Sequence, residues 1–136
     1  MSDVAERVKK LANRDPFVNY LGAEFTEVGP GTAVARMTLG EQHMNFNGTC
    51  HGGVLFSLAD AAFGLASNSH GRLAAAVDGH IGFTAPANAG EQLVATAREV
   101  NRSNRIGTYR VDVHRGDGNP VATFTGTVYI TTREHP

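Results

Sequence analysis

The segment 51–66 is the most apolar stretch of the chain, and the rest of the predicted fold is arranged around it. At 3.6 residues per turn its apolar side chains point in every direction. After His51, the first residue, the segment has two polar side chains, Ser57 and Asp60. A helix that is apolar on all sides is usually buried, and about 14 residues are too few to cross a membrane. We therefore predict a buried helix that carries one carboxylate, Asp60.

Shorter periodic patterns precede and follow this helix. Residues 3–14 predict an amphipathic helix that Asp15-Pro16 ends, and segments 20–28 and 32–39 predict a hairpin joined by a Gly-Pro-Gly turn. After the helix, which Asn68 to Gly71 should end, strands are expected at 73–83, 91–100, 108–114 and 121–131. The first of these should place one set of apolar residues on one face: Leu73, Ala75, Val77, Ile81 and Phe83.

These elements predict an α+β fold. A long helix that is apolar all round needs a surface that wraps it, and a curved antiparallel β-sheet provides one. The 136 residues are expected to form a single domain, 1–136. Sheet edges that stay open invite pairing between subunits, so a dimer is the expected assembly.

Composition narrows the classes of partner. The chain has 12 lysine and arginine residues and 13 aspartate and glutamate residues, which gives a net charge of −1. This balanced charge does not favour binding to a nucleic acid or to a membrane surface. One cysteine, Cys50, leaves no disulfide within the chain, and the charged N-terminal segment is not a secretory signal, so a cytoplasmic protein is expected. The six histidines lack metal-ligand spacing, and no nucleophile-elbow, phosphate-loop or dinucleotide motif occurs.

Asp60 is the most informative polar residue. Removing an ionised carboxylate from water costs several kcal/mol unless it is paired or hydrogen-bonded. A structural acid bonded to a neighbouring strand and a catalytic group both satisfy that requirement. Burial would raise the pKa of Asp60 toward the range of a general base.

The segment 45–60, NFNGTCHGGVLFSLAD, closely resembles the hotdog-fold thioesterases of the phenylacetic-acid-degradation (PaaI) type, and 81–91, IGFTAPANAGE, is similar to their strand and turn after the helix. The resemblance implies a hotdog fold. It also implies hydrolysis of acyl-CoA thioesters, often of the phenylacetyl-CoA or hydroxyphenylacetyl-CoA type, without metal or other cofactor. The expected assembly is a homodimer or a dimer of dimers (a homotetramer), with active sites at the subunit interface.

The same resemblance assigns roles to individual residues. Asp60 matches the catalytic carboxylate, acting as general base or as nucleophile. Gly53 matches the residue whose backbone N–H polarises the thioester carbonyl, and Asn45 matches the amide that positions water or substrate. His51 and Gly52 complete the loop that shapes the substrate site.

Elementary physics agrees with these roles. A helix N-terminus presents unpaired N–H groups and a positive dipole end to an oxyanion, and glycines there allow close approach. Gly53 and Asp60 are two turns apart, about 10 Å along a helix axis. That separation is too large for both to contact one carbonyl carbon, so the spacing favours a site shared by two subunits.

Other polar residues are open to two interpretations. Arg102 and Arg105, at a predicted hairpin tip, could bind the phosphates of CoA or simply be solvated. Ser57 is interpreted as a helix-packing hydroxyl rather than a nucleophile, and Cys50 as a small buried side chain.

Two further functions compete with the thioesterase. A non-catalytic acyl-CoA binding or sensor module would use the same pocket without releasing thiol. A hotdog acyl-thioester hydratase would need a histidine beside Asp60, and His51 is the candidate.

Overall fold

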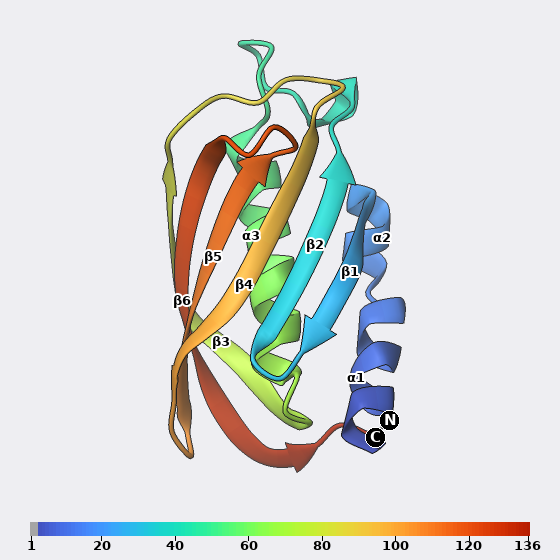
Figure 1. Ribbon diagram of the computed structural model, residues 1–136, viewed down its shortest axis with the longest axis vertical. Coiled ribbons are helices and arrows are strands. Elements are labelled where there is room, and N and C mark those ends of the chain that lie inside the picture. Colours follow the sequence, from blue (N-terminus) through green and yellow to red (C-terminus); the bar gives the residue numbers. More distant parts are fainter. Residues whose placement is uncertain (1–2) are drawn as a thin grey trace.

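One long helix, α3 (Gly52–Asn68), runs along the inside of a curved sheet of six strands (Figure 1). The computed structural model describes residues 3–136. In chain order the other elements are α1 (Asp3–Asn13), α2 (Pro16–Leu21), β1 (Ala23–Gly29), β2 (Thr32–Thr38), the short 3₁₀ helix η1 (Glu41–His43), β3 (Arg72–Phe83), β4 (Gln92–Arg102), β5 (Ile106–Arg115) and β6 (Pro120–Glu134). All neighbouring strands are antiparallel, in the order β1-β2-β4-β5-β6-β3. The predicted α+β fold is confirmed.

The core forms where α3 meets the concave face of the sheet. Small side chains at Ala59, Ala62 and Ala66 are fully buried and let the helix backbone approach the strands closely. Phe63 fills the remaining space and packs edge-on against Tyr109, with ring centroids 5.8 Å apart. The apolar pattern of 51–66 therefore produces a helix held by packing.

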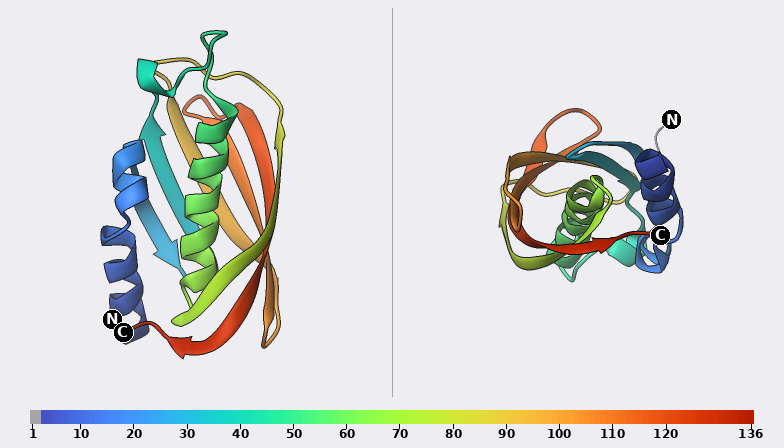
Figure 2. Two further views of the ribbon diagram at one scale, coloured as in Figure 1. Left: turned by 180° about the vertical axis from the view of Figure 1, so that it is seen from behind. Right: turned by 90° about the horizontal axis from the view of Figure 1, so that it is seen from below.

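The side of α3 that faces away from the sheet is open, so the prediction of a helix buried all round is wrong. Seen from behind, α3 lies in front of the strands with α1 and α2 on one side and β3 on the other (Figure 2). Gly53, Phe56 and Asp60 are exposed on this side. The cause is that the sheet curves around the helix without closing, because its edge strands β1 and β3 do not meet.

The N-terminal region contains a second helix where the sequence predicted the start of a strand at residue 20. The Asp15 side chain accepts a hydrogen bond from the Val18 N–H at 3.1 Å, and Pro16 occupies the first turn, so Asp15-Pro16 begins α2 as well as ending α1. Gly22, in the left-handed conformation at φ +84°, ends the helix, and β1 follows from Ala23.

A β-bulge in β3 changes which residues share a face. The pairing with β6 shifts between Ala76 and Asp78, leaving Val77 as the extra residue. Beyond the bulge Ile81 pairs with the buried Phe124, whereas before it Ala75 pairs with Tyr129, which is 45% exposed. The predicted common face of 73–83 is therefore wrong, because one inserted residue moves later side chains to the opposite face.

The remaining predicted elements are present with small changes in length. The hairpin of 20–28 and 32–39 turns at Gly31, and the strands expected at 91–100, 108–114 and 121–131 correspond to β4, β5 and β6.

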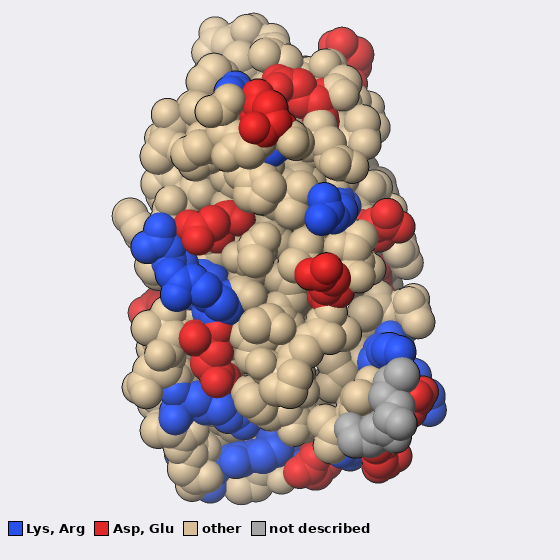
Figure 3. Space-filling model, viewed as in Figure 1, with Lys and Arg blue, Asp and Glu red and all other residues tan. Residues whose placement is uncertain are grey.

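Within residues 3–136 no helix is both long and apolar enough to span a membrane. On the sheet face shown in Figure 3, acidic and basic side chains are interspersed.

The close packing of Phe63 gives a test of the core. A Cβ added at Gly126 on β6 would lie 2.7 Å from the Phe63 ring, whereas one added at Gly82 on β3 would meet nothing within 4 Å. Gly126→Ala should lower the free energy of unfolding by about 1–3 kcal/mol through overpacking. Gly82→Ala, the matched control, should change it by less than about 0.5 kcal/mol. Chemical denaturation measures both, and equal effects would contradict this account of the core.

Candidate active site

A groove of about 610 Å³ lies between the open side of α3 and the two N-terminal helices. Leu11 and Phe17 line it from the α1–α2 region, Phe25 from β1, and Ser57 and Asp60 from α3. Its lining combines apolar side chains with two carboxylates, Asp60 and Asp15, and with the polar side chains of Arg14, Asn68 and His135. This combination is typical of a ligand site that holds an apolar group beside a reactive acid.

Asp60 is the ionisable group of α3 in this groove. Its side chain keeps contact with solvent, but partial burial raises the pKa of its carboxyl above the ordinary value, and the negative charge of Asp15 raises it further. Both aspartates line the same groove. A carboxylate whose pKa is raised in this way is a stronger base than a fully solvated one.

The N-terminus of α3 is capped by a histidine side chain. His51 Nδ1 accepts the Gly53 N–H at 2.8 Å, so the N–H assigned to carbonyl polarisation already has a partner within its own chain. The Val54 N–H bonds to the His51 carbonyl at 2.9 Å. Among the hydrogen bonds of residues 3–136, none uses the Gly52 N–H, which leaves it as the open donor of this helix start.

Asn45 holds the loop that leads into α3. Its Oδ1 accepts the N–H groups of Asn47 at 2.8 Å and Thr49 at 3.2 Å, and its Nδ2 donates to Thr49 Oγ1 at 3.2 Å. The Asn45 N–H also bonds to the Thr49 carbonyl at 2.7 Å. The Asn45 carboxamide therefore has a structural role in the loop, whatever role it has toward a substrate.

The predicted site residues fall into two groups within one chain. His51, Gly52 and Gly53 lie at the start of α3 and Asn45 in the loop that leads into it, while Asp60 lies in the groove, about 10 Å further along the helix axis from Gly53. None of the four lines the groove that contains Asp60. The two groups are therefore separated within one chain.

Arg102 and Arg105 lie at the β4–β5 hairpin, at the end of the molecule where α3 finishes, away from the start of α3 (Figure 1). Tyr109 Oη donates to Glu99 Oε1 at 2.6 Å and His70 Nε2 lies 2.9 Å from the same oxygen. Burial raises the pKa of the Glu99 carboxyl. The two contacts and the nearby charge of Arg102 lower this pKa further than burial raises it, so it lies below its ordinary value. Arg102 thus lies beside this partly buried polar cluster, and phosphate binding by either arginine stays a prediction.

Ser57 and Cys50 have the packing roles that the sequence predicted. Ser57 Oγ donates to the Gly53 carbonyl one turn earlier, at 2.7 Å, as expected for a helix-packing hydroxyl. Cys50 is buried, and burial raises the pKa of its thiol to about 11, so it is not a thiolate near neutral pH.

Sequence reasoning missed Asp15 and the aromatic wall of the groove. Asp15 and Phe17 reach α3 through the packing of α2, which itself was not predicted. Asp-Pro is the pattern of an N-cap followed by a first-turn proline, and that signal could have located α2.

A curved antiparallel sheet around one long central helix is the architecture of the hotdog thioesterases. Comparison with known proteins agrees. The chain belongs to the thioesterase superfamily, whose family model matches residues 47–122.

Individual relatives support the resemblance to the PaaI type. A putative esterase of Archaeoglobus fulgidus is 41% identical over 99% of this chain and 88% of its own length. Acyl-coenzyme A thioesterase PaaI of Escherichia coli is 38% identical over 85% of this chain and 83% of its own length. The structure of the E. coli PaaI protein from the phenylacetic acid degradation operon matches with a TM-score of 0.91 at 32% identity, covering 97% of this chain and 99% of that one.

The two aspartates of the groove give a test of its electrostatics. Asp15→Asn removes a negative charge but keeps a side-chain oxygen that can accept the Val18 N–H. The pKa of Asp60 should fall, and it should stay above its ordinary value because burial is the larger cause. Carbon-detected NMR titration of the Asp60 carboxyl measures the shift.

The matched control is Asp112→Asn, which removes a charge from the outer face of β5, where Asp112 pairs with Arg110. It should leave the titration of Asp60 unchanged. The same Asp60 pKa in Asp15→Asn and the unmodified protein would show that the two carboxylates do not interact through the groove.

Proposed function

We propose that this protein hydrolyses acyl-CoA thioesters to the free acid and CoA in the cytoplasm, with acyl groups of the phenylacetyl or hydroxyphenylacetyl type. The observation that carries the proposal is the Asp60 carboxylate, set in a mainly apolar groove on the central helix of a thioesterase-superfamily fold. Similarity to the E. coli PaaI protein supports the acyl class.

In the proposed reaction Asp60 acts as general base. Its carboxylate takes a proton from a water molecule as the water oxygen attacks the thioester carbonyl carbon. The tetrahedral intermediate then breaks its carbon–sulfur bond, and the CoA sulfur leaves as thiolate. The thiolate takes the proton held by Asp60, which yields the carboxylic acid and CoA thiol and regenerates the Asp60 carboxylate. A thiolate is a good leaving group, so one positioned carboxylate and one oxyanion donor are sufficient.

The oxyanion donor is proposed at the start of α3. The predicted donor, the Gly53 N–H, is held by His51 Nδ1 at 2.8 Å and would have to leave that bond or share it. The Gly52 N–H precedes it on the same helix end and has no hydrogen-bond partner within residues 3–136, which makes it the readier donor. Asn45, whose carboxamide builds the adjoining loop, is proposed to help position water or substrate.

The complete site is proposed to need two copies of the chain. Asp60 and the helix start are about 10 Å apart along one helix, so each would meet its partner group from a second copy. The surface beside them suits association, because β3 is a 12-residue edge strand and Val77, Phe83 and Phe56 expose 61%, 54% and 37% of their surfaces there. A homodimer, alone or paired into a tetramer, supplies this arrangement.

Thiol release tests the activity directly. Purified protein should release CoA thiol from phenylacetyl-CoA and hydroxyphenylacetyl-CoA faster than from acetyl-CoA or palmitoyl-CoA. Asp60→Asn should lower kcat by about 10²–10⁴-fold, since that is the usual contribution of a general base. Ser57→Ala, the control on the same groove wall, should retain activity because its hydroxyl serves the helix backbone.

The outcomes separate the competing functions. Tight binding of the thioesters without thiol release from any of them would contradict the thioesterase and favour an acyl-CoA binding module. Addition of water across a carbon–carbon double bond of an enoyl-CoA, with the thioester intact, would favour a hydratase.

Assembly through β3 gives a separate prediction. Val77→Asp places a charge on the exposed bulge of β3 and should convert the oligomer to monomer, with loss of thiol release, while the chain stays folded. Val100→Asp, at a similarly exposed position on β4 near the hairpin, is the control and should leave both unchanged. Analytical ultracentrifugation and circular dichroism measure assembly and folding, and a fully active Val77→Asp monomer would refute the shared site.

A further inference from the structure

Phe46 is the most exposed large apolar side chain among the described residues, at 98%. It lies at the tip of the loop that connects η1 with α3, and this loop projects beyond the end of the sheet (Figures 1 and 2). With this exposure Phe46 has almost no contact with its own chain. A single exposed apolar side chain is common on protein surfaces, so the case for Phe46 depends on where its loop lies relative to the proposed site.

The loop that carries Phe46 is firmly built. Met44 and Cys50 form a β-bridge at its base, and the Cys50 N–H bonds to the Ala87 carbonyl at 2.7 Å. Asn45 closes the turn through its side chain and backbone, and Gly48 takes the left-handed conformation at φ +77° that the turn requires. These hydrogen bonds hold the loop backbone on both sides of Phe46, while its side chain stays in solvent.

The groove beside Asp60 lacks a wall on its solvent side. Phe17 and Phe25 provide two aromatic surfaces, and α3 provides the opposite side through Asp60 and Ala61. Phe17 remains 54% exposed, so an apolar acyl group lying there would leave part of its surface in water. A further apolar side chain is needed to enclose it.

We propose that Phe46 of one copy covers the acyl groove of a second copy and makes it selective for acyl groups that contain an aromatic ring. This inference rests on the proposed function, in which the start of α3 of one copy meets Asp60 of the other. Phe46 belongs to the loop that leads directly into that helix start, so the same association carries its ring to the mouth of the groove. There it adds a third aromatic surface to Phe17 and Phe25, and an aryl group can stack against it.

The proposal makes Phe46 a specificity residue, and a substitution should affect substrates differently. Phe46→Ala should lower kcat/KM for phenylacetyl-CoA roughly tenfold, mainly through KM, while acetyl-CoA, whose acyl group does not reach the ring, should change by less than about twofold. Phe46→Tyr should restore the preference for aryl groups. Because Phe46 is exposed, none of these changes disturbs the core.

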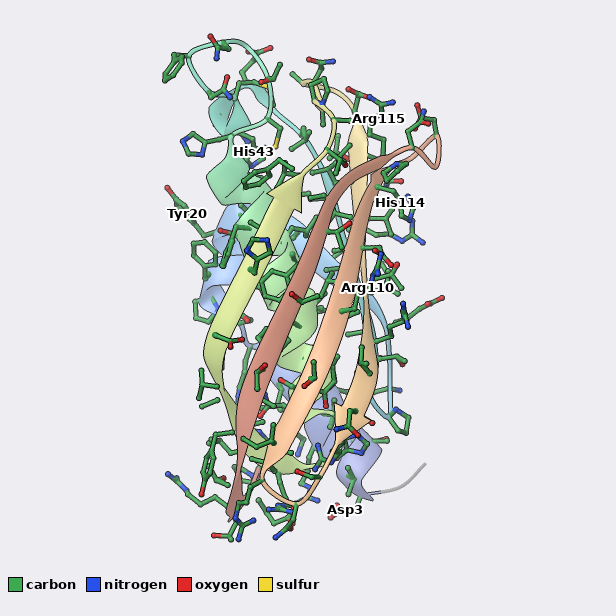
Figure 4. The ribbon with its side chains drawn as sticks, turned by 90° about the vertical axis from the view of Figure 1, so that its left-hand side faces the viewer. Asp3, Tyr20, His43, Arg110, His114 and Arg115 are labelled. Carbon is green, nitrogen blue, oxygen red and sulfur yellow. The ribbon has the colours of Figure 1, made fainter. Side chains whose placement is uncertain are left out.

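Tyr20→Ala is the matched control. Tyr20 is an aromatic residue on α2 that is 88% exposed and points away from the body of the molecule (Figure 4). It does not line the groove. Its replacement should leave the ratio of phenylacetyl to acetyl hydrolysis unchanged, and an equal loss in Tyr20→Ala and Phe46→Ala would overturn the specific role of Phe46.

Mixed dimers test whether Phe46 acts across the interface. Chains carrying Phe46→Ala and chains carrying Asp60→Asn are given different affinity tags, co-expressed and purified by both tags in turn. In the mixed dimer one site combines an intact Asp60 with the intact Phe46 of the other chain. Its KM for phenylacetyl-CoA should return to that of the unmodified protein, whereas a KM equal to that of the Phe46→Ala dimer would show that Phe46 acts within its own chain and would refute the proposal.

Binding distinguishes failure of this inference from failure of the proposed function. Calorimetry compares phenylacetyl-CoA binding to Asp60→Asn and to Asp60→Asn/Phe46→Ala, where no hydrolysis interferes. A roughly tenfold weaker affinity in the double variant supports the aromatic contact even if the unmodified protein releases no thiol. Equal affinities refute it even if the unmodified protein is an active thioesterase.

Discussion

The packing of α3 against the concave sheet is the interaction on which the rest of the structure depends. Burying one large apolar side chain contributes about 1.5–3 kcal/mol, and this helix buries Leu55, Leu58, Phe63 and Leu65 together with three alanines along the same sides. The sheet has one helix to enclose and curves around it without closing. The uncovered side of α3 is where Asp60 keeps its access to solvent and to ligands.

Most of the fold could be predicted because its signals are local. Alternating residues defined β4, β5 and β6, and a continuous apolar run defined α3. The errors arose where local signals are ambiguous: Asp15-Pro16 ends one helix and begins another, and the bulge at Val77 leaves no mark in composition. The open side of α3 was misjudged because apolar residues that line a groove or an edge resemble core residues in a sequence.

The candidate site was predictable in part for the same reason. Asp60 stands out as a charge within an apolar helix, and its groove gives that position a physical context. The influence of Asp15 depends on how α2 packs, and the choice between Gly52 and Gly53 as donor depends on the rotamer of the His51 side chain. Neither can be read from spacing. Arg102 illustrates the opposite case, because a residue at a hairpin tip turned out to lie beside Glu99 and Tyr109.

The two walls of the groove come from different parts of the chain. The family match begins at residue 47 and includes α3 with Asp60, whereas Leu11, Phe17 and Phe25 on the facing wall precede it. Substitutions in the N-terminal helices therefore reshape the pocket without altering the helix that carries the carboxylate or the sheet that supports it. Such a division lets the shape of the groove change on one wall while the wall that carries Asp60 stays the same.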